Sequence, residues 1–130
     1  MNTRINLLEV LAYLNKSDLI AAVEILVLDE TYRRSVCKLR CRLLPSKYQL
    51  SVRFIQTKTE LIYAYQLFSS APLARWDNEP HFPKLASFPH HFHDRMGTVF
   101  DSPLSGDVFV DLDIVLAAIP TIISELELTA

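Results

Sequence analysis

Glycine is scarce in this sequence, which contains only Gly97 and Gly106 among its 130 residues. Loops that bind nucleotide phosphates through the backbone need several closely spaced glycines. The shortage therefore argues against sites for nucleoside triphosphates and dinucleotides. The sequence also has no internal repeat, low-complexity tract or linker, so residues 1–130 are expected to form a single domain.

Cysteine is equally rare, and Cys37 and Cys41 are the two that occur. In a β-strand their Cα atoms would be separated by ~13 Å, which is too far for a disulfide. A reduced, buried pair is expected, as is usual for cytoplasmic proteins. No apolar run approaches the roughly 18 residues that a membrane-spanning helix needs, and the first residues do not resemble a secretory signal. The sequence thus predicts a cytoplasmic protein with no membrane segment.

Acidic residues are absent between Thr31 and Thr59, whereas ten lie between Glu60 and the end of the chain. The acid-free window holds most of the basic residues, namely Arg33, Arg34, Lys38, Arg40, Arg42, Lys47, Arg53 and Lys58. The net charge of −2 hides this asymmetry. A basic middle part favours an anionic partner such as nucleic acid, or a partner protein that binds both the basic and the acidic part of the chain.

The hydrophobic pattern predicts an α+β fold. Helical spacing of apolar residues occurs near the start and again near the end of the chain, over 5–14 and 111–126. Between them, the expected strands cover 21–28, 37–43, 48–54, 61–67 and 73–76, several with strict alternation. Short connections favour an antiparallel β-sheet of four to six strands, packed against an N-terminal and a C-terminal helix.

The end of the chain carries further signals. Asp111 is placed to cap the last helix at its N-terminus, and Pro120 should kink that helix. Val99-Phe100 and Val108-Phe109-Val110 could form a strand that pairs within the chain or with a second copy. The sequence is therefore compatible with a homodimer.

All four histidines fall in the stretch from His81 to His93, close to Arg75 and Asp77. The cluster has three interpretations, and its members are His81, His90, His91 and His93. One is a metal site, such as zinc, in which Asp77, His81 or Asp94 would join His91 and His93. Another is general acid–base catalysis, with Arg75 stabilising a phosphate. The last is a structural role in a proline-rich loop that crosses the sheet.

Arg75 and Asp77 are two residues apart, so on a strand they would share one face and could form an ion pair. The basic residues that alternate along the expected sheet, Lys38, Arg40, Arg42 and Arg53, would likewise share a face. They have no acid nearby in sequence, and a phosphate backbone would relieve their mutual repulsion. A charged outer sheet face is, however, also an ordinary structural feature.

The segment Arg75-Trp76-Asp77-Asn78-Glu79-Pro80-His81, followed by Pro89-His90-His91-Phe92-His93, resembles the TumE-type toxin family of toxin–antitoxin pairs. Its hallmark is R-[YFW]-D-N-x-P-H followed by P-H-H-x-H. The resemblance implies a toxin that a cognate antitoxin, usually a helix-turn-helix protein, binds and silences. Together with the histidines it suggests an endoribonuclease in which Arg75, Asp77, His81, His90, His91 and His93 form the site.

The sequence departs from this family in places. Phe82 stands where relatives often have a histidine, Arg53 lies near a position that is often acidic, and Leu44-Pro45-Ser46 replaces a D-G-[ST] turn. Two alternatives to an RNA-cleaving toxin therefore stay open. One is a non-catalytic protein that binds a metal through His91, His93 and Asp94. The other is a decayed toxin that survives as a partner-binding module.

Overall fold

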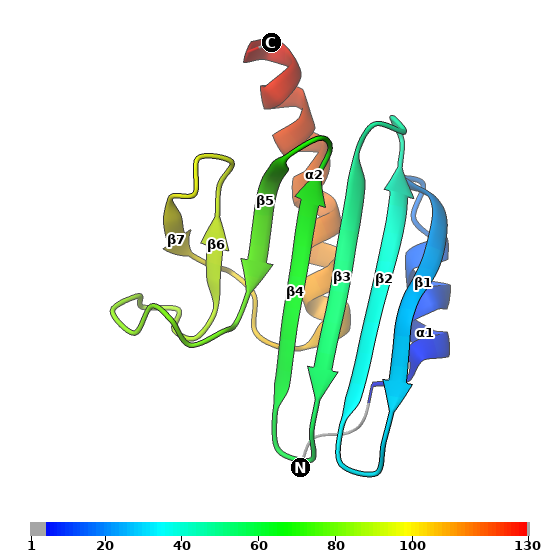
Figure 1. The fold of residues 1–130 in the computed structure, drawn as a ribbon. Helices are drawn as coiled ribbons and strands as arrows, with labels where there is room; N and C mark the ends of the chain where they lie inside the picture. The colour runs from blue at the N-terminus through cyan, green and yellow to red at the C-terminus, as the bar shows by residue number, and fades with distance from the viewer. Residues whose placement is uncertain (1–4, 130) are drawn as a thin grey trace.

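The computed structural model describes residues 5–129 as one antiparallel sheet with two helices (Figure 1). Along the chain the elements are α1 (Leu7–Asn15), β1 (Ile20–Glu30), β2 (Ser35–Leu43), β3 (Gln49–Gln56), β4 (Leu61–Phe68), β5 (Pro72–Asp77), β6 (His91–His93), β7 (Val99–Asp101) and α2 (Val108–Thr129). The strands lie side by side in the order of the sequence, β1 to β7. From β1 to β5 short connections impose this arrangement, because a strand that follows a tight turn pairs with its predecessor, whereas a longer loop joins β5 to β6.

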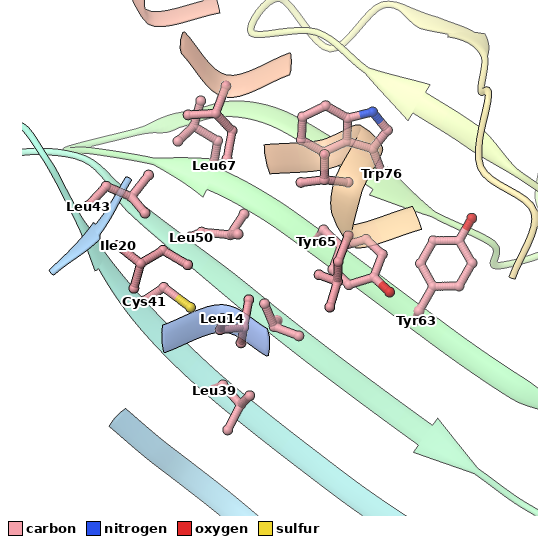
Figure 2. Close-up of a cluster of buried hydrophobic side chains, with 14 of the residues drawn as sticks. Leu14, Ile20, Leu39, Cys41, Leu43, Leu50, Tyr63, Tyr65, Leu67 and Trp76 are labelled. Carbon is pink, nitrogen blue, oxygen red and sulfur yellow. The ribbon is translucent and has the colours of Figure 1, made fainter. Parts of the chain in front are cut away.

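Both helices pack on one face of the sheet, α1 behind β1 and β2, and α2 behind the middle strands (Figure 1). Alternate strand residues point to this face and form the core (Figure 2). The largest side chains buried there are Tyr63, Tyr65, Leu14, Leu39, Leu43, Leu50, Leu67, Leu112 and Ile119. Cys37 and Cys41 are free and buried in this core, as expected, and burial raises the pKa of Cys41 to about 12.

Within residues 5–129, no helix covers the opposite face of the sheet (Figure 1). Lys38 pairs with Arg53 across β2 and β3, and Arg40 pairs with Ser51, so the basic side chains share this open face as predicted. The sequence suggested that no acid relieves them, but β1 places Glu24 opposite Arg40. The repulsion is therefore smaller at the β1 edge than toward the centre of the sheet.

The sheet has seven strands, not four to six. The additional strands are β6 and β7, each of three residues, which pair with β5 and with each other. The histidine segment was expected to be a loop throughout, yet its last part forms β6. Three residues are too few to show a period of two in the sequence. Their strand conformation depends on the hydrogen bonds that β5 offers at its free edge.

Helix α2 begins at Val108, so the Val108-Phe109-Val110 segment is helical and the prediction of a strand there was wrong. Asp107 caps the helix by accepting a hydrogen bond from the Val110 N–H at 3.3 Å. The expected cap, Asp111, lies inside the first turn, where its buried carboxylate accepts from the Gly106 N–H at 2.8 Å. Over residues 5–129, neither helix is long and apolar enough to span a bilayer.

Candidate functional site

The candidate site lies on the open face of the sheet, where β5 pairs with β6. Arg75 is opposite His93, and Asp77 is opposite His91. Because side chains alternate along a strand, these four project to the open face while Trp76 and Phe92 project to the core side. The rings of Trp76 and Phe92 pack with centroids 5.0 Å apart, which fixes the two strands against each other.

Asp77 is the centre of the cluster, and its side chain is 4% exposed. Its Oδ2 accepts from the Arg75 Nε at 2.7 Å, and its Oδ1 lies 2.9 Å from the His91 Nε2. The Glu79 N–H also donates to Oδ1 at 3.0 Å, and the His93 Nε2 lies 3.7 Å from Oδ2. The Arg75–Asp77 pair expected from the spacing is thus present. A carboxylate with this many partners holds its orientation firmly.

His91 is buried beneath the ring of Phe82, whose centroid lies 4.8 Å from the imidazole centroid. Its Nδ1 lies 3.1 Å from the Pro89 carbonyl oxygen. A carbonyl and a carboxylate can only accept, so each ring nitrogen donates when it carries a hydrogen, Nδ1 to Pro89 and Nε2 to Asp77. Nε2 is therefore the nitrogen directed at Asp77. With so little exposure, His91 orients the cluster and does not reach solvent.

Arg75 and His93 are the more exposed members, with about a third and a quarter of their side chains accessible. Both line a hollow of about 500 Å³ between β4, β5 and the β6–β7 turn, together with Gln66. Gln66 accepts from the Arg75 Nη1 at 3.2 Å and so holds the guanidinium at the hollow. Burial, aided by the neighbouring His91, lowers the pKa of His93, which favours a neutral imidazole near pH 7.

A second hollow of about 230 Å³ lies beside the first on the open face, and Gln66 lines both. Lys38, Arg40, Ser51 and Phe68 complete its walls. Two of the predicted nucleic-acid contacts, Lys38 and Arg40, thus adjoin the site. Arg42 lies on the same face opposite Gln49, outside the lining of this hollow. The fourth, Arg53, forms an ion pair with Glu79 at 3.2 Å and is less available.

Two of the predicted site residues lie apart from Asp77. His81 is exposed in the loop after β5, where its Nε2 contacts Glu79 at 3.1 Å. His90 is on the core side, where its Nδ1 lies 2.7 Å from the hydroxyl of the buried Tyr63 and its ring stacks on that tyrosine. Because His90 and His91 are adjacent in an extended segment, they face opposite sides of the sheet. His90 therefore contacts Tyr63 and not the Asp77 cluster.

Two residues near the cluster, Gln66 and Glu79, were not singled out from the sequence, and Phe82 was named only as a departure from the family pattern. Gln66 could have been found by extending the register from Arg75 into β4, because the two are direct partners. Glu79 links Arg53 to His81 across the loop, which no local pattern indicates. Phe82 covers His91 and His93 through a turn of the loop that the sequence alone does not specify.

Asn78 extends β5 through its side chain. Its Oδ1 accepts from the Tyr63 N–H at 2.9 Å, and its Nδ2 donates to the Leu61 carbonyl at 2.8 Å. Replacement by Ala would leave both backbone groups of β4 unpaired, so we expect Asn78→Ala to lower the free energy of unfolding by about 1–3 kcal/mol. Urea denaturation measures this loss. Asn78→Asp keeps the acceptor for Tyr63 but sets a carboxylate oxygen against the Leu61 carbonyl, so it should also be less stable than the wild type, and equal stability of all three proteins would contradict the assignment.

Three side chains of the described residues could hold a metal ion: Asp77, His91 and His93. Their ligand atoms all lie within 4.8 Å of one another. Of the further ligands that the sequence offered, namely Asp77, His81 and Asp94, it is Asp77 that lies with the two histidines. The Asp94 carboxylate instead accepts from the backbone N–H groups of Met96 and Thr98, both at 2.9 Å, in the β6–β7 turn.

Comparison with known proteins agrees with the motif on β5 and β6. The family model described as "Toxin TumE" matches residues 10–126, which is nearly the whole chain and includes every member of the Asp77 cluster. No curated protein and no solved structure matches the chain. A family match of this extent covers the sheet, the site and α2 together. The chain therefore belongs to the TumE toxin family.

Proposed function

We propose that this chain is the toxin component of a toxin–antitoxin pair and that it acts on RNA at the Asp77 cluster. Its membership of a toxin family implies a cognate antitoxin. The observation that supports RNA as the target is the continuity of the two hollows on the open face. One contains Arg75 and His93, the other contains Lys38 and Arg40, and Gln66 belongs to both.

RNA suits this surface because its charge is spread along a chain of phosphates. Lys38 and Arg40 would contact the backbone, with Arg42 beside them on the same face, while Arg75 would bind the phosphate at the reacting position. Phe68 offers a ring for stacking with an unpaired base. These features favour a single-stranded segment over a rigid duplex.

In this proposal the exposed members of the cluster contact the RNA, and the buried members position them. Arg75 stabilises the charge that develops on the phosphate oxygens, and His93 faces the same hollow, where the attacking hydroxyl would lose its proton. Asp77 and His91 lie behind them and hold both groups in place. In this proposal His90 supports the fold, and His81 lies at the rim.

A test of this proposal uses purified protein and a labelled single-stranded RNA. We expect cleavage by the wild type, and weaker binding with a smaller salt dependence for the double variant Lys38→Ala/Arg40→Ala. Loss of two phosphate contacts should reduce the slope of log K against log salt by about 1.4. The charge-matched control is Arg33→Ala/Arg34→Ala in the β1–β2 turn, which lies outside both hollows and should behave like the wild type.

Expression in cells provides the second half of the test. Growth arrest with fragmented RNA, relieved by the gene encoding the antitoxin, is the expected result. Intact RNA in vitro and normal growth would contradict the proposal. They would favour a partner-binding module that has lost activity. One observation is consistent with that second candidate. Phe82 stands where relatives often have a histidine, and its ring covers His91 and His93, with centroids 4.8 and 5.8 Å away.

A further inference from the structure

We propose that Asp77, His91 and His93 bind a divalent transition-metal ion of the zinc class. The proposed action on RNA is not required for this binding. It enters only in one consequence: with the ion bound, His93 would be a ligand, and the ion in its place would make the attacking hydroxyl more acidic. Two imidazoles and one carboxylate form a ligand set typical of such ions. The three side chains come from adjacent strands, so the sheet fixes their positions before any ion arrives.

The spacing of the ligand atoms fits a coordination sphere. A tetrahedral ion with bonds of about 2.0–2.1 Å separates its ligand atoms by roughly 3.4 Å. The His91 Nε2 and Asp77 Oδ1 are 2.9 Å apart, and the His93 Nε2 is 3.7 Å from Asp77 Oδ2. The two distances end on different oxygens of Asp77, and all three ligand atoms lie within 4.8 Å of one another. Entry of an ion at Oδ1 would therefore need a side-chain shift that draws His93 inward, and no change of the sheet.

The surroundings of the ligands also match those of metal sites. Metal-binding histidines usually donate their second N–H to a carbonyl or carboxylate, which aims the other nitrogen at the ion. His91 does so, with Nδ1 donating to Pro89. The carboxylate of Asp77 is oriented in the same manner by the Arg75 Nε and the Glu79 N–H.

Arg75 determines where the ion would lie. Its Nε donates a hydrogen bond to Oδ2 of Asp77, whereas the His91 Nε2 contacts Oδ1. The ion would replace the hydrogen bond between Oδ1 and His91 and leave the contact with Arg75 in place. One carboxylate would then face two positive groups, the ion and the guanidinium. This excess of positive charge favours an anionic ligand such as a phosphate group.

The position of His93 leaves room for that anion. His93 and Arg75 both line the hollow of about 500 Å³. Three protein ligands with a fourth position open to a cavity are characteristic of catalytic zinc sites, whereas structural sites are closed by four. The site would therefore bind water or a phosphate oxygen at the open position.

Cobalt and zinc titrations of the untagged full chain, after removal of metals with EDTA, test this proposal. We expect one Co²⁺ per chain, with the visible absorption bands of a low-coordinate site that Zn²⁺ displaces. His93→Ala should weaken binding by roughly 100-fold or more, because it removes a ligand and not only an outer contact. His93 is partly exposed, so this variant should remain folded. His81→Ala is the matched control, since it removes an exposed histidine outside the cluster, and should bind like the wild type.

Either of two results would overturn the metal site. One is the lack of stoichiometric binding at about 100 µM ion, and the other is equal binding by His93→Ala and the wild type. The RNA assay separates this outcome from the proposed function. Cleavage of RNA by metal-free protein in EDTA would reject a metal in the reaction while the action on RNA stands. Stoichiometric binding that depends on His93, without RNA cleavage, would support the metal site and reject the action on RNA.

Discussion

Arg75→Ala is expected to abolish the growth arrest caused by expression of this chain and to reduce RNA cleavage at least about 100-fold. Arg75 is the guanidinium that faces the hollow beside His93, and Gln66 and Asp77 hold it there. Lys38 and Arg40 line the neighbouring hollow, and Arg95, which also lines the first hollow, lies in the β6–β7 turn away from Asp77, so we do not expect these groups to replace its charge at the reacting phosphate. Growth curves and gel analysis of total RNA measure the effect.

The control for this variant is Arg33→Ala, which removes the same charge in the β1–β2 turn. Circular dichroism should show the same fold for both variants. Arg75→Lys keeps a positive charge but loses the planar fork that contacts Asp77 and Gln66, so an intermediate activity is expected. Undiminished growth arrest by Arg75→Ala would exclude Arg75 from the site, whatever the target of the toxin.

The histidine chosen for such a test matters. His91 is 1% exposed, and its ring packs against Phe82 and His93. His91→Ala would therefore open a cavity and leave Asp77 short of a partner, so a loss of activity could reflect a damaged fold. His93→Ala is the better variant, because its side chain is partly exposed and lines the hollow.

Asp77→Ala is expected to lower the free energy of unfolding by about 3–5 kcal/mol. The variant removes a buried carboxylate that joins β5 to β6 and to the start of the following loop. The Glu79 N–H and the His91 Nε2 would lose their contact with Oδ1, and Arg75 would lose its counter-charge. Denaturation in urea measures the change as a shift of the midpoint with little change in slope.

Asp77→Asn separates charge from shape in this test. The amide keeps the volume and one acceptor oxygen, so a smaller loss of stability is expected than for Asp77→Ala. Asp101→Ala is a second comparison, because Asp101 is an exposed carboxylate that accepts from Ser87 at the β7 edge. A loss below about 1 kcal/mol for Asp77→Ala would mean that the cluster contributes no more than a surface ion pair.

Much of the fold could be predicted from local patterns. Strands β2 and β3 alternate inward apolar and outward polar residues, which is enough to identify them and their inward faces, whereas β1 is recognised by its run of branched apolar residues. Strand β6 could not be predicted, since three residues carry no recognisable period, whereas Val99-Phe100 was a candidate strand and lies in β7, which pairs within the chain. The conformation of β6 depends on pairing with β5, a partner that lies across a loop.

For the site, the sequence by itself determined that Arg75 and Asp77 share one face of their strand. It also determined that Lys38, Arg40 and Arg42 share one face of theirs. Alternation along a strand is a property of the backbone, so it needs no tertiary information. Tertiary structure alone decided which histidines join Asp77. The register of β5 with β6 brings His91 and His93 to the carboxylate, while the same alternation sends His90 to Tyr63 on the core side. Register between strands separated by a loop depends on the packing of Trp76 against Phe92 and on the path of the loop, and neither is encoded in a local pattern.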